Sequence, residues 1–490
     1  MPTAPKPTLL KQISQLPFLK EAWKLLNTSN KKSSGLSRST VQEFDDNRLS
    51  NLKSISKALA SGSFKFSPVK GVAIKKKNKG HRSLMISEIQ DRVVHKALAL
   101  KLEKTLTKAF KLRNVCSFAY QKNLSIQDAI VQMASYYNDG YKFILEADIQ
   151  SFFPTVDNKM LLESIYQKLP DNSINVLLNE ALNQELGNRE ELKQKNFKVY
   201  EDIFSSEENG IPTGNALSPL FANVFLADFD QRMIKEKIKM IRYADDFIIM
   251  CKTKDEAKAA YEIAYEELTT KRKLILYPLK ETAAEGEKIS RVLNPKENIF
   301  TFLSVRFDGH RCFIPESKMA NLLSKLYDLA SPTAFRTNFP DLEFSLLQVL
   351  TKIKNSLDGW IAAYSFLEIE NELKEIDKHV DIVLYQIFKE FGFILKTKEL
   401  VKIAPKHTLQ FNKDGKPILK RTSNEKSGLK PLQRKNAGIP LCLNTYKKST
   451  LEMMSFAERV SAVTNGLAKP KKRKIIRPHA STKSDLDNSF

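Results

Sequence analysis

Cysteine, histidine and tryptophan are scarce in this 490-residue chain, which contains 4, 6 and 2 of them. The cysteines lie far apart, so neither a paired-cysteine zinc module nor a disulfide framework is predicted. No apolar run reaches the ~18 residues that a membrane-spanning helix needs, and Met1–Lys20 lacks the apolar core of a signal peptide. We therefore expect a cytoplasmic protein without a membrane partner.

Acidic residues are also in deficit. Lys and Arg number 79 and Asp and Glu 56, which gives a formal net charge of +23, and a chain this basic most often binds nucleic acid. Residues 396–490 hold 22 Lys and Arg against 7 Asp and Glu, a balance of +15. A basic tail is usually a solvated arm, and a nuclear-localisation signal is another alternative. We favour RNA binding by a cluster in this tail, made of Lys471, Lys472, Arg473, Lys474 and Arg477.

Two adjacent carboxylates lie between apolar, β-prone runs in the middle of the chain. The pattern predicts a hairpin with Met240–Tyr243 and Phe247–Cys251 as strands and with Asp245 and Asp246 at its turn. Adjacent carboxylates repel each other unless a cation is bound, and hard oxygen ligands without His or Cys suit Mg²⁺. Taken alone, the dipeptide is better explained as a polar hairpin tip.

A third acid lies upstream. Tyr141–Pro154 contains an apolar run that ends at Asp148, and an acid is unfavourable at the end of a buried strand without a partner or a metal. Glu146 shares a strand face with Asp148, either as a further acid or as an edge charge. Asp148 and Asp245 together predict a site for two divalent cations, which activate a 3′-hydroxyl and neutralise a leaving pyrophosphate.

These acids belong to an ordered series of motifs that resembles reverse transcriptases of the group II intron and bacterial retroelement kind. The series departs from the family pattern at Thr213, where glutamine is usual, and at Ser304, where glycine is usual. Its members are a basic hairpin at Val72–Ile86, a loop and helix at Gly210–Leu226, Tyr-Ala-Asp-Asp (the YADD motif) at 243–246, a primer-grip-like hairpin at Phe300–Gly309 and a thumb-like segment at Asn355–Tyr364.

The resemblance implies an α+β, right-hand polymerase. No paired-Cys pattern or His-Asn-His cluster follows the thumb, so an appended nuclease is disfavoured. The expected parts are an N-terminal helical extension (1–50), fingers (51–147), a palm with an antiparallel sheet (148–310, with an insertion at 158–209 between the acidic motifs), a helical thumb (315–395) and a basic C-terminal RNA-binding region (396–490).

The resemblance also implies a metal site. Asp148, Asp245 and the main-chain carbonyl of Ile149 would bind two Mg²⁺, for which Mn²⁺ would substitute. Asp246 would support the site electrostatically.

For the nucleotide, Phe153 would exclude ribonucleotides by a clash with the 2′-hydroxyl. Lys280 is either a general acid for the pyrophosphate or a surface lysine. The full set of expected nucleotide-binding residues is Lys76, Arg82, Phe153, Gly214 and Lys280.

The expected activity is RNA-directed DNA synthesis, in which a primer 3′-hydroxyl attacks the α-phosphate of a dNTP on a structured RNA template to give a DNA product. A compact enzyme with a basic extension and no nuclease looks most like bacterial unknown-group reverse transcriptases linked to antiphage defence. These often copy a dedicated non-coding RNA, and some form homo-oligomers. The alternatives are a group II intron maturase, a retron enzyme and, from another class, a catalytically silent RNA-binding scaffold.

Overall fold

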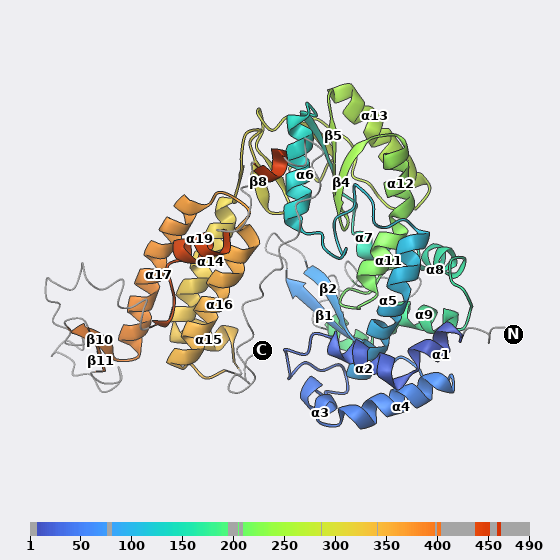
Figure 1. The fold of residues 1–490 in the computed structure, drawn as a ribbon, viewed down its shortest axis with the longest axis horizontal. Coiled ribbons are helices and arrows are strands. Elements are labelled where there is room, and N and C mark those ends of the chain that lie inside the picture. The colour runs from blue at the N-terminus through green and yellow to red at the C-terminus, as the bar shows by residue number, and fades with distance from the viewer. Residues whose placement is uncertain are drawn as a thin grey trace. The chain divides into compact units, whose positions relative to one another are not determined.

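The computed structural model describes residues 7–75, 81–194, 204, 209–285, 287–340, 342–396, 399–402, 437–450 and 458–461. These residues form two compact units, which are described separately, and Figure 1 labels most of their elements. The first unit comprises the described residues of Met1–Ala129 and Tyr136–Leu293. The second comprises those of Ile130–Ser135 and Asn294–Pro470.

Much of the first unit is helical and is organised around the long helix α5. Helices α1 and α2 pack against α5, and α4 packs against both of them. Helix α3 begins with a capping box, in which the side chains of Thr40 and Glu43 each accept a hydrogen bond from the other residue's backbone N–H. These helices are α1 (Leu9–Ile13), α2 (Leu16–Lys24), α3 (Val41–Asp46), α4 (Arg48–Ala60) and α5 (Ile89–Ala109).

A two-stranded hairpin precedes α5. Strands β1 (Lys70–Lys75) and β2 (His81–Ile86) are antiparallel, with Lys75 opposite His81. The predicted basic hairpin is therefore confirmed in its two strands, while its tip at residues 76–80 lies outside the described residues.

The main sheet of the first unit is entirely antiparallel, with the order β4-β5-β3-β6. Tyr243 pairs with Asp246 at the end of the β4–β5 hairpin, which leaves a two-residue turn. The hairpin predicted from the two apolar, β-prone runs is confirmed, except that Asp246, also predicted at the turn, is the first residue of β5. The strands are β3 (Phe143–Ala147), β4 (Lys239–Tyr243), β5 (Asp246–Cys251) and β6 (Arg291–Leu293).

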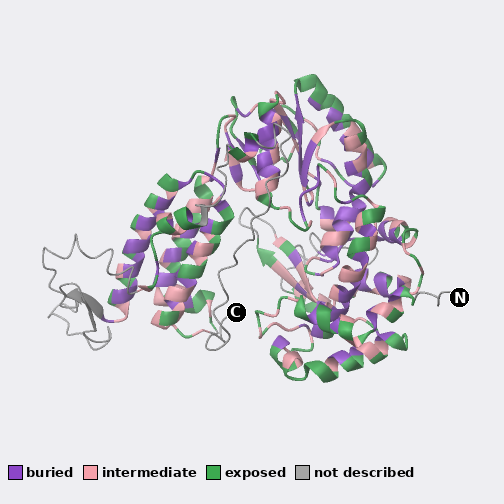
Figure 2. Cartoon of the chain, viewed as in Figure 1, coloured by how far each residue is buried: buried purple, intermediate pink, exposed green. Residues whose placement is uncertain are grey.

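Strand β5 is buried from Phe247 to Cys251 because helices cover the sheet (Figure 2). Helix α13 (Lys254–Tyr265) packs against β3, β5 and β6, and α12 (Ala227–Lys235) packs against β4. The side chain of Thr253 caps α13 by accepting a hydrogen bond from the backbone N–H of Glu256. A strand covered in this way needs a continuous apolar sequence, as β5 has.

Helix α11 (Ser218–Phe225) links the two parts of the first unit, since it contacts α5, α8 and α12. A single hydrophobic core runs from Leu9 to Leu276, so the first fifty residues share their core with the sheet. Other helices of this unit include α7 (Phe152–Thr155), α8 (Asn158–Tyr166), α9 (Asn175–Leu182) and the π-helical turn η1 (Glu266–Thr270).

The second unit combines a three-stranded antiparallel sheet, β7-β8-β9, with a helical bundle. Helix α14 packs against α16 and α17, and α19 packs against the same two helices. Helix α6 contributes its residues Ile130–Ser135 to this unit. The described elements of this unit include part of α6 (Ile126–Asn138), β7 (Phe300–Phe302), β8 (Val305–Phe307), β9 (Cys312–Phe313), α14 (Glu316–Ala330), α15 (Pro332–Asn338), α16 (Leu346–Tyr364), α17 (Glu370–Glu390), β10 (Phe393–Lys396), β11 (Glu399–Lys402) and α19 (Cys442–Thr450).

Within the described ranges, no helix has both the length and the apolarity that crossing a membrane requires.

Candidate active site

Three carboxylates meet at one end of the main sheet. Ala147 pairs with Phe247 across β3 and β5, so the residues next to them, Asp148 and Asp246, lie opposite each other. Asp245 occupies the adjoining turn between β4 and β5. The structure thus brings together the three acids that the sequence singles out.

Burial, together with the charges of neighbouring acids, raises the pKa values of Asp245 and Asp246. Burial raises the pKa of Asp246 to about 6, and the charges of Asp245 and Asp148 add to the rise, while Lys288 and Arg82 oppose it. The pKa of Asp245 is raised by burial and by the charge of Asp148. Such a cluster favours a cation, because a cation relieves the repulsion between like charges.

Arg82, on β2, is a predicted nucleotide-binding residue whose charge reaches the acids. Its charge lowers the pKa of both Asp245, in the turn, and Asp246, at the start of β5. It also acts on Tyr120, whose pKa is raised chiefly by burial and then by the charge of Asp245. The Tyr120 side chain is half exposed, and its backbone is left-handed, with φ of 58°. No motif in the sequence singles out this tyrosine as a site residue.

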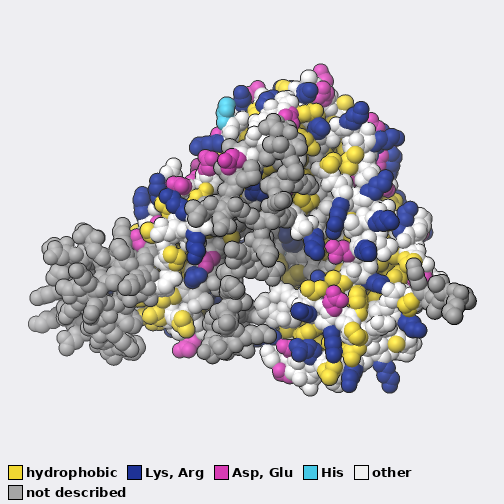
Figure 3. Space-filling view, viewed as in Figure 1, with side chains coloured by type: hydrophobic (Ala, Val, Ile, Leu, Met, Phe, Trp, Pro, Cys, Tyr) yellow, Lys and Arg dark blue, Asp and Glu magenta, His cyan; other side chains and the backbone are white. Residues whose placement is uncertain are grey.

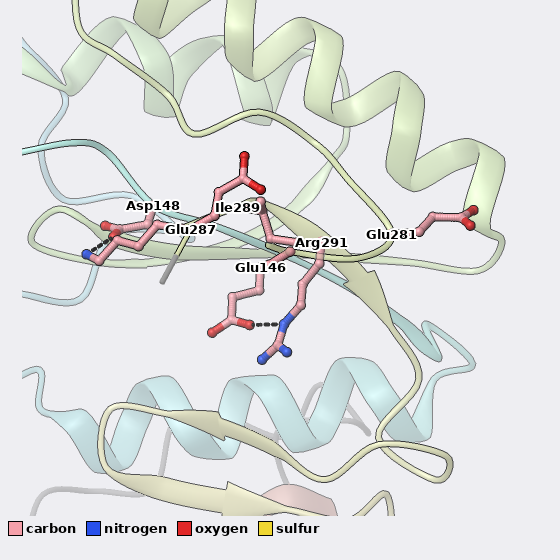
Figure 4. Close-up of a pocket in the computed structure, with 8 residues that line it drawn as sticks. Glu146, Asp148, Glu281, Glu287, Ile289 and Arg291 are labelled. Carbon is pink, nitrogen blue, oxygen red and sulfur yellow. Dashed lines mark hydrogen bonds and ion pairs between the residues drawn. The ribbon is translucent and has the colours of Figure 1, made fainter. Parts of the chain in front are cut away.

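An open pocket of about 370 Å³ lies beside Asp148 (Figure 4). The amine of Lys288 lies 3.1 Å from Asp148 Oδ2. Lys280, for which the sequence left two interpretations, instead pairs with Glu287 at 2.6 Å. The pocket is lined by Glu146, Asp148, Glu281, Ala283, Glu287, Lys288, Ile289 and Arg291.

Glu146, which the sequence left open as a further acid or an edge charge, pairs with Arg291 across β3 and β6. Arg291 Nε lies 2.8 Å from Glu146 Oε2 (Figure 4). This pairing favours the edge-charge interpretation, because a basic partner on the neighbouring strand already neutralises the carboxylate.

The loop that precedes α11 is fastened to β2. Thr213 O accepts a hydrogen bond of 2.9 Å from Met85 N, and Thr213 Oγ1 donates one of 2.6 Å to Ser83 O. Gly214 follows with φ of 100°, and a Cβ there would lie 2.9 Å from both Leu84 Cδ1 and Met85 O. The predicted site residue Gly214 must therefore be glycine for backbone reasons.

Phe153 and Ile149 lie on the chain that leaves Asp148. The ring of Phe153 is half buried, with its centroid 5.5 Å from that of Phe152. Ile149 forms an antiparallel bridge with Leu276 in which the flanking residues make the hydrogen bonds. Because successive carbonyls of an extended chain alternate, the Ile149 carbonyl points away from this neighbour.

The other predicted site residues cannot be placed in the structure. Those outside the described residues are Lys76, Lys471, Lys472, Arg473, Lys474 and Arg477.

Comparison with known proteins identifies the central segment. Residues 74–307 match the model of the family described as "Reverse transcriptase (RNA-dependent DNA polymerase)". This segment is a reverse transcriptase domain. The α+β architecture with antiparallel sheets fits the right-hand fold of reverse transcriptases, as the sequence predicts.

Relatives of the reverse transcriptase domain include proteins encoded in introns. The group II intron-encoded protein LtrA of Lactococcus lactis subsp. cremoris is 27% identical over 268 residues, which is 54% of this chain and 39% of LtrA. The putative COX1/OXI3 intron 2 protein of Saccharomyces cerevisiae is 24% identical over 53% of this chain and 32% of its own length. Protein YkfC of Escherichia coli K12 is 24% identical over 42% of this chain and 60% of its own length. The chain thus spans less than two thirds of each of these relatives.

Two solved structures are also similar to this chain. A chain of the partial Cas6-RT-Cas1–Cas2 complex matches 58% of this chain and 44% of its own length, with 24% identity and a TM-score of 0.33. Apo telomerase from Candida tropicalis matches 66% of this chain and 63% of its own length, with 13% identity and a TM-score of 0.38.

The acids of the reverse transcriptase domain fit a hard divalent cation. No three His, Cys, Asp or Glu side chains in the described ranges form a ready-made metal cage. Mg²⁺ does not need such a cage, because it is usually bound by one or two carboxylates and completes its shell with water and substrate phosphates. Asp148, Asp245 and Asp246 supply that kind of donor set, and burial and like charges raise the pKa values of Asp245 and Asp246, which a bound cation would counteract.

Proposed function

We propose that the chain is an RNA-directed DNA polymerase that extends a primer 3′-hydroxyl with dNTPs on an RNA template. The observation that carries this proposal is the convergence of Asp148, Asp245 and Asp246 at one sheet end, inside a reverse transcriptase domain. A scaffold without catalysis has no need of three carboxylates that repel one another. The proposal is therefore favoured over the RNA-binding scaffold.

The positions of the acids support the metal-binding roles that we propose. Asp148, Asp245 and the carbonyl of Ile149 bind the cations, and Asp246 holds negative charge beside them. Two bound Mg²⁺ ions, or Mn²⁺ in their place, supply activation of the attacking hydroxyl and neutralisation of the pyrophosphate.

Basic and aromatic residues around the acids bind the nucleotide. Arg82 and Lys288 flank the acids and contact the triphosphate, as charged donors do in phosphate sites. Phe153 abuts the sugar and Gly214 lets the loop approach β2. Lys76 and Lys280 are assigned to the same nucleotide site.

We propose the division of the chain that the sequence predicts. Fingers occupy residues 51–147, the palm 148–310 and the thumb 315–395, with the N-terminal helices supporting the fingers. The basic residues 396–490 bind the RNA, Lys471–Lys474 and Arg477 among them. Lys and Arg side chains are also spread over the face seen in Figure 3, which suits a polyanionic partner.

We further propose that the template is a dedicated, structured non-coding RNA and that the enzyme acts in antiphage defence in the bacterial cytoplasm, where it can form homo-oligomers. Support comes from the basic tail, where Lys and Arg far outnumber Asp and Glu. A second candidate, a group II intron maturase, is supported by the similarity to intron-encoded proteins. The defence enzyme and the maturase differ in the RNA that each would bind.

The test is primer extension by the full-length chain on an RNA template with dNTPs and Mg²⁺. Asp148→Asn, Asp245→Asn and Asp246→Asn should each abolish DNA synthesis. Glu146→Gln is the matched control, because it removes a carboxylate from the same strand that is already paired with Arg291. The control should synthesise DNA at a rate close to that of the wild type.

Sequencing of the RNA that copurifies from the native host distinguishes the candidates. One discrete non-coding RNA with complementary DNA supports the dedicated template, whereas spliced or unspliced intron RNA supports the maturase. DNA synthesis that survives Asp245→Asn, or a wild type that extends no primer on any RNA, refutes the polymerase.

A further inference from the structure

Arg242, on β4, is a fully buried arginine whose guanidinium uses all five of its N–H groups. Nε and Nη2 donate to the two carboxylate oxygens of Asp230 at 2.7 and 2.5 Å. Nη2 also donates to Ser117 Oγ at 2.9 Å, and Nη1 donates to Asn223 Oδ1 at 3.1 Å and to the carbonyl of Ala244 at 2.8 Å. Five is the full donor capacity of arginine.

These bonds join four segments that are separate in the sequence. Asn223 is on α11 and Asp230 on α12, Ser117 follows α5, and Ala244 is in the turn between β4 and β5. The backbone of Arg242 adds two more links, since its N–H donates to Cys116 O at 2.7 Å and its carbonyl accepts from Phe118 N at 2.9 Å. Arg242 therefore ties the turn to three other parts of the first unit.

The turn residue that Arg242 contacts has an unfavourable conformation. Ala244 has φ of 61°, in the left-handed region that a residue with a Cβ adopts reluctantly. Backbone in such a conformation persists when its surroundings hold it. The bond from Arg242 Nη1 to the Ala244 carbonyl is a direct restraint, placed one residue before Asp245.

A buried ion pair is weak evidence for a contribution to stability. The cost of desolvating the two charges offsets their attraction, and apolar residues in their place often stabilise a fold equally well. The directional bonds of the guanidinium explain its presence better. We propose that Arg242 is a positioning residue, which holds the Ala244 turn so that Asp245 and Asp246 present their carboxylates together to a divalent cation. The expected effect on DNA synthesis rests on the proposed function. The expected effect on metal binding does not, so a metal-binding measurement tests the positioning role separately.

Lysine cannot replace this arginine. Its ammonium keeps the charge beside Asp230 but is a compact point donor that lacks the planar fork. Arg242→Lys should therefore loosen the turn while leaving the buried carboxylate partly neutralised.

Arg272 offers a matched control in the same unit. It is also buried, and it donates to Asp228, to Glu267 and to the carbonyl of Phe225, but it does not contact the turn. Arg272→Lys should lower the melting temperature as Arg242→Lys does, without affecting the acids.

The experiment is a thermal-shift titration of the full-length chain with Mn²⁺, starting from protein in EDTA. Cation binding to the folded state raises the melting temperature. Arg242→Lys should raise the half-saturating Mn²⁺ concentration about tenfold or more, as loss of a residue that orients metal ligands does, and Arg272→Lys should leave it within about twofold. In primer extension, Arg242→Lys should lower kcat and leave the KM for dNTP nearly unchanged.

The positioning role is overturned if Arg242→Lys has the same half-saturating Mn²⁺ concentration as the wild type. It is also overturned if Arg242→Lys and Arg272→Lys weaken Mn²⁺ binding equally. If Arg242→Lys does not fold, Asn223→Ala replaces it, since it removes one anchor of the guanidinium, and an unchanged titration then overturns the proposal. A wild type that binds Mn²⁺ and makes no DNA refutes the polymerase alone. In that case the shifted titration of Arg242→Lys still supports the positioning role.

Discussion

The amine of Lys288 lies 3.1 Å from Asp148 Oδ2, although the two residues are 140 positions apart in the sequence. Both side chains are well exposed, at 67% and 39%, so the pair contributes little to stability. Burial lowers the pKa of Lys288, but the hydrogen bond and charge of Asp148 outweigh it and raise the pKa overall. Lys288 is thus held in its charged form beside Asp148, at the place where we propose that a cation and a phosphate bind.

The first prediction compares two lysines of one loop. Lys288→Gln should lower the rate of DNA synthesis by about tenfold or more, because a charged donor beside the reacting phosphates is lost. Lys280→Gln should have an effect of less than about threefold, since a pair as exposed as that of Lys280 with Glu287 contributes little. Single-turnover extension measures both. A larger loss in Lys280→Gln would instead favour the general-acid interpretation of Lys280.

The second prediction concerns the backbone at Gly214. Gly214→Ala should destabilise the fold by about 1–3 kcal/mol, because its Cβ would lie 2.9 Å from the Met85 carbonyl and φ is 100°. Gly359→Ala is the control, since it lies in α16 with no atom within 4 Å of its Cβ. That substitution should stabilise by about 0.5–1 kcal/mol. Urea unfolding gives both values, and equal effects would contradict the steric argument.

The third prediction concerns Phe153. Phe153→Val should reduce the preference for dNTP over rNTP by about tenfold or more, because the 2′-hydroxyl then meets a smaller side chain. The measurement is the ratio of kcat/KM for the two substrates on one template. Phe110→Val is a control for general loosening, since Phe110 follows α5 and packs against the same core. A selectivity that does not change would remove Phe153 from the sugar site.

The acidic hairpin could be predicted from sequence because its signals are local. Two apolar runs on either side of a two-residue turn define both strands and the place of Asp245. Asp148 followed from a strand that ends in an acid. The contact of Lys288 with Asp148 could not be predicted, because a lysine in a polar loop has the same sequence signal whether it meets solvent or a distant carboxylate.

The burial of Arg242 also escaped sequence reasoning, since arginine is almost never fully buried unless it is paired. A usable signal was present. Arg242 is flanked by Ile241 and Tyr243 in a strand whose neighbours are apolar, and an inward-facing arginine in such a strand requires a buried acid. The identity of that acid, Asp230 on α12, depends on how the helix packs against β4 and has no local signal.

The fourth prediction concerns Asp91, a fully buried acid on α5. Its Oδ2 accepts a hydrogen bond of 3.0 Å from Ser67 N, and its Oδ1 has no partner among the described residues. Burial, more than any other cause, raises its pKa to about 7. In the unfolded chain the group ionises near pH 4, so the native state binds more protons between pH 4 and 7. Stability should therefore fall as pH rises through this window and level off above it.

Asp91→Asn removes the titrating group, so its melting temperature should depend less on pH between 4 and 7 than that of the wild type. A pKa rise of this size corresponds to at most about 4 kcal/mol. Asp358→Asn is the control, because Asp358 is an exposed acid on α16 that pairs with Lys354 at 2.7 Å, and it should keep the wild-type slope. Calorimetry across the window measures all three proteins. Parallel slopes for wild type and Asp91→Asn would mean that Asp91 is ionised in the folded chain below pH 7, and that the Ser67 bond outweighs its burial.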